Sequence, residues 1–197
     1  MDYYGGMKQF DNKVNTTQGR LSGTNDTTIK QCDILTYPDT TLRRVSQSVE
    51  NIDGSIISLI GQMASIMYQA RGVGLAAIQV GIEKKIIIYD VTQESGNRDL
   101  QALINPQIIS REGEEISEGE GCLSLPDFRA NVKRSASVFV TGLDSNGNPL
   151  EIEAQELLAV VLQHEIDHLN GVLFIDHISA LKRNLYKRRV KKKLKKG

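Results

Sequence analysis

Two segments of the chain place apolar residues at the 3.6-residue period of an amphipathic helix. The first lies between Ile52 and Ala70 and ends at the glycines that follow. The second spans residues 154–170, is rich in Ala, Leu and Gln, and ends at Asn170 and Gly171, a pair typical of a helix C-cap. The pattern therefore predicts two long helices, one in each half of the chain.

Between these helices, apolar and β-branched runs predict a series of strands. The runs are KKIIIYDV (84–91), LINPQIIS (103–110), SVFVTGLD (137–144) and PLEIEA (149–154). The polar stretch DSNGNP (144–149) joins the last two as a hairpin turn, and ESGNRD (94–99) is a predicted loop. Strands and helices are segregated rather than alternating, which predicts an α+β fold of antiparallel strands packed around the second helix.

The two ends of the chain differ from its middle. Residues 1–29 are rich in Gly, Asn, Thr and Asp without a hydrophobic period, which predicts a disordered leader or an expression remnant. Residues 30–178 carry the predicted helices and strands, and a length of 197 residues suits one domain of that size. Residues 179–197 form a separate, basic C-terminal helix or tail.

The composition is that of a globular protein, with 40% hydrophobic and 24% charged residues. No apolar run approaches the roughly 18 residues that a membrane span needs. Two cysteines are too few for a disulfide framework, which indicates a reducing compartment. The first residues contain acidic side chains and no apolar core of a signal peptide, so we expect a cytoplasmic protein.

The formal net charge of zero hides an asymmetry. Between Lys182 and Lys196 there are ten basic residues and no acidic ones, which leaves fourteen basic against twenty-four acidic residues in the remainder. Leu181, Leu185, Val190 and Leu194 recur among these charges, which predicts a basic amphipathic helix. Such a helix suits a polyanion such as nucleic acid, and a solvated terminal helix is the alternative.

The second predicted helix carries QHEIDHLNG (163–171), in which His164 and His168 stand four residues apart. Histidines at this spacing lie one turn apart on the same helix face, so both imidazoles can bind one ion. Glu165 follows the first histidine, as in H-E-x-x-H metallohydrolases, where the carboxylate handles a proton of water on the metal. Two unpaired imidazoles after the apolar run LLAVVL would be costly, which favours ligation.

A catalytic site of this kind usually has a third protein ligand. His177 does not fit, because the longer H-E-x-x-H-x-x-G-x-x-H motif requires a ligand at position 174, which is Phe174. Cys122, in EGEGCLSLPDF, is the other soft ligand, and its neighbouring glycine lets the backbone approach closely. Taken alone, such a cysteine is more often a buried packing residue.

Three motifs together make the chain resemble a peptide deformylase. They are GVGLAAIQ (72–79), EGCLS (120–124) and QHEIDHLNG (163–171), in that order. The likeness extends from about Ile34 to about Ile178 and includes YPDTTLR near its start and FRANVKR after the cysteine motif. Ile78 is a small departure, at a position where relatives often have Pro or another residue.

The resemblance implies a hydrolase that removes the formyl group from N-formylmethionine at the start of new polypeptides. It implies Cys122, His164 and His168 as metal ligands and Glu165 as general base and acid. It also implies that Gln79 and the backbone N–H of Leu123 hold the oxyanion. Contacts to the substrate are expected from Gly74 and Arg129 by resemblance, and a methionine pocket from the apolar residues Val73, Leu125 and Val161.

The same resemblance implies one divalent ion, Fe(II) in the cell, with Zn, Ni or Co able to occupy the same ligands. A Cys-His-His set accepts Zn readily, so the residues alone do not select the metal. The basic C-terminal helix resembles one that docks on the ribosome near the exit of the nascent chain. Two other functions remain open at this point: another H-E-x-x-H peptidase, and a non-enzymatic ribosome or RNA-binding module.

Overall fold

The computed structural model describes residues 34–92 and 98–195, and the expected leader 1–29 lies outside them. The predicted α+β class is confirmed, with antiparallel strands and three α-helices. The helices are α1 (Gly54–Gln69), α2 (Glu156–Leu169) and α3 (Ala180–Leu194). The strands are β1 (Gly74–Ala76), β2 (Ile86–Tyr89), β3 (Gln101–Glu112), β4 (Glu115–Gly121), β5 (Arg129–Arg134), β6 (Ser137–Leu143) and β7 (Pro149–Gln155).

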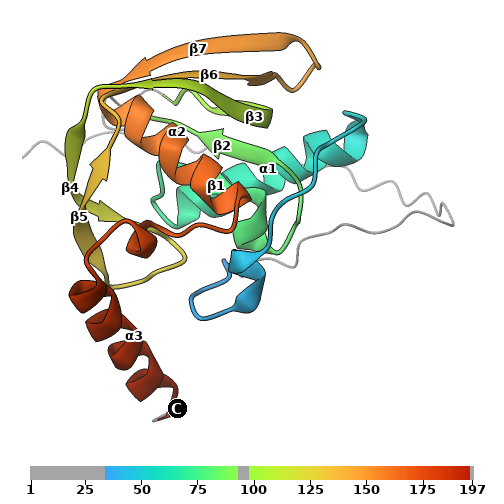
Figure 1. Ribbon diagram of the computed structural model, residues 1–197. Helices are drawn as coiled ribbons and strands as arrows, with labels where there is room; N and C mark the ends of the chain where they lie inside the picture. Colours follow the sequence, from blue (N-terminus) through green and yellow to red (C-terminus); the bar gives the residue numbers. More distant parts are fainter. Residues whose placement is uncertain (1–33, 93–97, 196–197) are drawn as a thin grey trace, which may run out of the picture.

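Five strands form one antiparallel sheet in the order β1-β2-β3-β6-β7, and β4 and β5 form a separate hairpin (Figure 1). Successive residues of a strand point to opposite faces, and β2 shows the result. Ile86 and Ile88 pack with α1, whereas Ile87 packs with α2. The two long helices therefore cover opposite faces of the sheet, each burying its own apolar core.

The ends of α1 and α2 follow the signals in the sequence. The Asp53 carboxylate caps α1 by accepting a hydrogen bond from the backbone N–H of Ser55 at 2.9 Å. Asn170 ends α2, and Gly171 follows with a left-handed φ of 72°. The helix begins two residues later than its pattern predicts, because β7 continues to Gln155.

Helix α3 contradicts the expected apolar face. Leu181, Leu185 and Leu194 are exposed by 72%, 56% and 64%, while Tyr186 is buried and Val190 is partly buried against the body. The reason is geometric: at 3.6 residues per turn, a step of nine positions from Leu181 to Val190 is two and a half turns, which places them on opposite sides of the helix. The ring of Tyr186 stacks on Phe128 at 4.4 Å and packs on Tyr37 at 5.9 Å, and Lys193 pairs with Asp127 at 2.9 Å, so Tyr186 anchors the helix together with this ion pair.

In Figure 1, α2 lies between the large sheet and the β4–β5 hairpin, and α3 projects away from the body. Within the described residues, none of the helices has the length and apolarity required to cross a bilayer.

Candidate active site

Helix α2 places two imidazoles at a buried point next to the end of the β4–β5 hairpin. His164 and His168 lie on one face of the helix, and both are buried. Cys122 follows β4 directly, so the hairpin carries its thiol to the same point. The ligand atoms of these three residues all lie within 4.8 Å of one another, and Cys122 Sγ is 3.2 Å from His168 Nε2.

The environment of this cluster keeps one imidazole in the form that binds a metal. Burial, together with the positive charges of His164 and Arg134, lowers the pKa of His168 well below its ordinary value, which keeps the ring neutral and able to bind a metal. Burial also lowers the pKa of His164, but hydrogen bonds to Cys122 and Glu120 outweigh it and raise that pKa. The neutral His168 ring and the sulfur and nitrogen donors of the cluster therefore fit a transition metal such as Zn or Fe(II).

A buried ion pair supports His164 from behind. His164 Nδ1 lies 2.8 Å from Glu120 Oε1, and Arg134 Nη2 donates to the same oxygen at 2.6 Å. Arg134 also donates to Asp167 Oδ2 at 2.6 Å, which His177 Nε2 contacts at 2.8 Å. His177 is therefore tied to this network and not to the three candidate ligands, as its spacing predicts.

Glu165 is buried beside the cluster, and its Oε2 atom has no hydrogen-bond partner among the described residues. Burial is the main cause that raises the pKa of its carboxyl to about 7. Gly74 packs against this side chain so closely that a Cβ atom there would lie 2.5 Å from Glu165 Oε1. A carboxyl that titrates near neutral pH suits general acid and base chemistry.

Gln79 reaches the same point from the 3₁₀ helix Ala77–Val80, which follows β1. Its side chain is buried, and its Oε1 accepts a hydrogen bond from the backbone N–H of Ala76 at 2.8 Å. Its Nε2 lies 3.7 Å from Cys122 Sγ. A donor group is thus held beside the candidate metal ligands.

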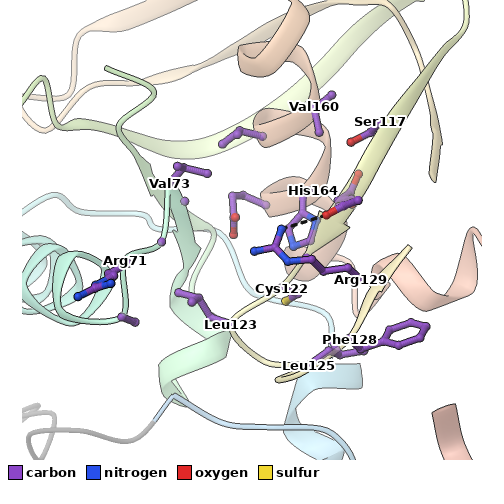
Figure 2. A pocket seen from close by; sticks show the side chains of 18 of the residues that line it. Arg71, Val73, Ser117, Cys122, Leu123, Leu125, Phe128, Arg129, Val160 and His164 are labelled. Atoms are coloured by element: carbon purple, nitrogen blue, oxygen red, sulfur yellow. Dashed lines mark hydrogen bonds and ion pairs between the residues drawn. The ribbon is translucent and has the colours of Figure 1, made fainter. Parts of the chain in front are cut away.

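These residues lie along one cleft of about 880 Å³. Figure 2 shows His164 and Cys122 in its middle, with Val73 on one side and Arg129 on the other. Ten of the eleven predicted site residues line it, namely Val73, Gly74, Gln79, Cys122, Leu123, Leu125, Arg129, Val161, His164 and Glu165. His168 is not among the lining residues and is fully buried beneath them.

The residues of the cleft differ in exposure as a binding site requires. Leu125 and Val161 are buried, whereas Val73 is 41% exposed on the segment that enters edge strand β1. Arg129 is exposed, and its Nη1 donates to the carbonyl of Gly119 at 3.0 Å. Leu125 and Val161 therefore form the interior of the cleft, and Val73 and Arg129 lie nearer its mouth.

Sequence reasoning assigned no role to Glu120 or Arg134, although both carried a signal. Glu120 belongs to the EGCLS motif, two residues before a candidate ligand. In β5 the odd and even positions alternate between exposed and buried, with Ala130, Val132 and Arg134 inside. That period of two identifies Arg134 as an inward-pointing arginine, and a buried arginine requires an acidic partner. The strands β4 and β5 were also not predicted.

Comparison with known proteins agrees with this geometry. The family model described as polypeptide deformylase matches residues 31–184. A peptide deformylase of Desulfosudis oleivorans is 50% identical over 163 residues, which cover 83% of this chain and 94% of that protein. A peptide deformylase of Rhizobium meliloti is 48% identical over 168 residues, covering 85% and 95%.

Solved structures show the same fold. A peptide deformylase from Legionella pneumophila has a TM-score of 0.76 at 43% identity, covering 82% of this chain and 94% of that one. The enzyme from Ehrlichia chaffeensis in complex with actinonin has a TM-score of 0.76 at 40% identity, covering 82% and 96%. We conclude that this chain belongs to the peptide deformylase family, the metal-dependent hydrolases that remove the N-terminal formyl group from polypeptides.

Proposed function

We propose that Cys122, His164 and His168 hold the catalytic ion of this deformylase and that Glu165 transfers the proton of the reaction. The observation that carries the proposal is the convergence of the three ligand atoms within 4.8 Å at the base of the cleft. When bound, such an ion acts as a Lewis acid that lowers the pKa of water and polarises a carbonyl. Glu165 accepts the proton of the attacking water and donates it to the departing amine.

In the same proposal, Gln79 Nε2 and the backbone N–H of Leu123 donate to the formyl oxygen as negative charge develops on it. Removal of one such donor typically costs about 10²-fold or more in rate. Leu125 and Val161 would receive the methionine side chain, because both are apolar, buried and part of the cleft wall. Val73 would border the methionine pocket on its exposed side, and Gly74 and Arg129 would contact the peptide backbone.

We propose Fe(II) as the ion in the cell, on the family resemblance, with Zn, Ni or Co able to bind the same three residues. The test is formate release from a formyl-Met peptide under anaerobic conditions, with the metal-free protein reloaded with Fe(II) or Zn(II) and its metal content measured. We expect the Fe(II) form to be the more active and to lose activity in air, because a thiolate on Fe(II) is open to oxidation. An equally active, air-stable Zn(II) form would contradict the choice of iron.

The peptidase alternative predicts a different product. A deformylase releases formate and leaves every peptide bond intact, whereas a peptidase creates a new amine within the chain. The family assignment favours the first, and the same assay measures both products. A non-enzymatic RNA-binding module would leave the metal cluster and the cleft without a role.

We propose further that α3 contacts ribosomal RNA and that the protein acts in the cytoplasm, where nascent chains emerge. Residues 30–178 would form the catalytic part and residues 179–197 the docking part. Support comes from the concentration of basic residues on α3, most of which are exposed. Contacts between Lys or Arg and phosphates would make this binding fall steeply with salt.

A further inference from the structure

Ser124 lies two residues after Cys122, and the proposed reaction does not use it. Its side chain is fully buried, and its Oγ accepts a hydrogen bond from Gln79 Nε2 at 3.1 Å. Hydrogen bonds to their backbone carbonyls also hold Gln79 and Ser124 in place. The backbone N–H of Leu35 donates to the Gln79 carbonyl at 2.7 Å, and that of Tyr37 donates to the Ser124 carbonyl at 2.8 Å.

The hydrogen bonds decide which way the Gln79 amide faces. The backbone N–H of Ala76 donates to Oε1 at 2.8 Å, so the NH₂ group must lie on the other side. That group has two hydrogens and two neighbours, Ser124 Oγ at 3.1 Å and Cys122 Sγ at 3.7 Å. Ser124 Oγ accepts one of these two hydrogens. The second hydrogen therefore lies on the side of the amide that faces Cys122.

We propose that Ser124 is a positioning residue, whose hydroxyl holds the Gln79 amide so that one N–H points at the formyl oxygen. The inference rests on the proposed role of Gln79. A free glutamine side chain rotates about several bonds, and that freedom is costly at a site whose donors must be preorganised. Without the hydroxyl, the buried NH₂ group loses its oxygen acceptor, and Cys122 Sγ at 3.7 Å becomes its nearest remaining partner.

A double-mutant cycle tests the inference by formate release. Ser124→Ala should lower kcat about tenfold, the effect of losing one hydrogen bond, with KM within about twofold. Gln79→Ala should lower kcat about 100-fold. The double variant should match Gln79→Ala within about twofold, because Ser124 then has no amide to position. Metal content is measured in every variant.

Two further variants serve as controls. Ser46 is also buried, and its Oγ has no hydrogen-bond partner among the described residues, so Ser46→Ala should leave kcat unchanged. Ser124→Thr keeps the hydroxyl and should retain most of the activity. Should Ser124→Ala lose its metal or its fold, Ser124→Cys goes through the same cycle, with a weak acceptor in nearly the same volume, and should also lower kcat.

The outcomes separate the two claims. If Ser124→Ala slows the reaction as much in the Gln79→Ala background as in the wild type, its role is structural and the inference fails. If Ser124→Ala has no effect while Gln79→Ala has a large one, the inference fails but the role of Gln79 stands. If Gln79→Ala itself retains full activity, the proposed oxyanion donor is wrong.

Discussion

His164 Nδ1 lies 2.8 Å from Glu120 Oε1, and this contact sets the chemistry of the histidine. Burial raises the pKa of Glu120, but hydrogen bonds from His164 and Arg134 outweigh it and lower that pKa to about 2. Glu120 is therefore ionised and accepts a hydrogen from Nδ1, which leaves Nε2 of His164 as the atom free to bind a metal. A carboxylate from the hairpin thus determines how a helix residue presents its ligand atom.

Replacement of this carboxylate should weaken metal binding. Glu120→Gln keeps the size of the side chain but loses the charge that orients and activates His164, so we expect metal affinity to fall about 10- to 100-fold. Competition against a chelator of known affinity measures it. Glu118→Gln, an exposed change in the same strand, is the control. Equal affinity in Glu120→Gln and the wild type would show that the contact does not tune the site.

A methyl group at position 74 should slow the reaction without removing the metal. The Cβ atom of Gly74→Ala would lie 2.5 Å from Glu165 Oε1, so the carboxylate must move. Such a displacement of a catalytic group can cost about 10²-fold in kcat. At Gly61, in α1, a Cβ atom would meet nothing within 4 Å, so Gly61→Ala should keep the wild-type kcat. Steady-state formate release compares the two, and similar rates would contradict the proposed position of Glu165.

The raised pKa of Glu165 predicts the acid side of the pH profile. As general base, this carboxyl must be ionised, so kcat/KM should fall as the pH drops through its pKa. Burial places that pKa at about 7, and a bound cation would lower it toward the ordinary value of 4.5. We therefore expect the fall in kcat/KM to have its midpoint at a pH between 4.5 and about 7. The metal content is measured at each pH. Constant kcat/KM down to pH 4.5 would contradict the assignment.

Charge reversal on α3 should weaken ribosome binding without affecting catalysis. Lys191 and Lys192 are exposed and lie outside the contacts that hold α3 to the body, so their replacement by Glu should not disturb the fold. Each lost phosphate contact should reduce the salt dependence of binding by about one unit of slope. Co-sedimentation with ribosomes at several salt concentrations measures this salt dependence. The control is a double variant in which Arg111 and Lys133, two exposed basic residues outside α3, are replaced by Glu. Unchanged co-sedimentation would remove α3 as the docking element.

The sequence predicted those features that have a local period. The spacing of His164 and His168 determines a common helix face, and the apolar, β-branched runs of β2, β3, β6 and β7 predict strands. Cys122 came from motif resemblance, because no local pattern predicts that a loop forty-two residues upstream will meet α2. Long-range contacts of this kind depend on the packing of the β4–β5 hairpin, which the sequence pattern did not identify.

For helix α3, the sequence pattern predicted an apolar face that the structure does not have. Four apolar residues among many charges predicted an apolar face, but the step from Leu185 to Val190 is too long for a helical face to continue. The aromatic contacts of the helix come from Tyr186, which packs on Phe128 in the loop after the cysteine motif and on Tyr37 near the start of the fold. The angular positions of apolar residues around the helix axis, rather than their number, therefore decide whether they form one face.

The most direct test of the central claim is formate release by Glu165→Ala, measured on protein whose bound metal has been quantified. Cys122, His164 and His168 remain in this variant, so it should bind about one metal ion per chain like the wild type. Without the carboxylate that moves the proton, its kcat should fall about 10²- to 10⁴-fold. Full activity in the metal-replete variant would contradict the account, because Glu165 could then not be the general base.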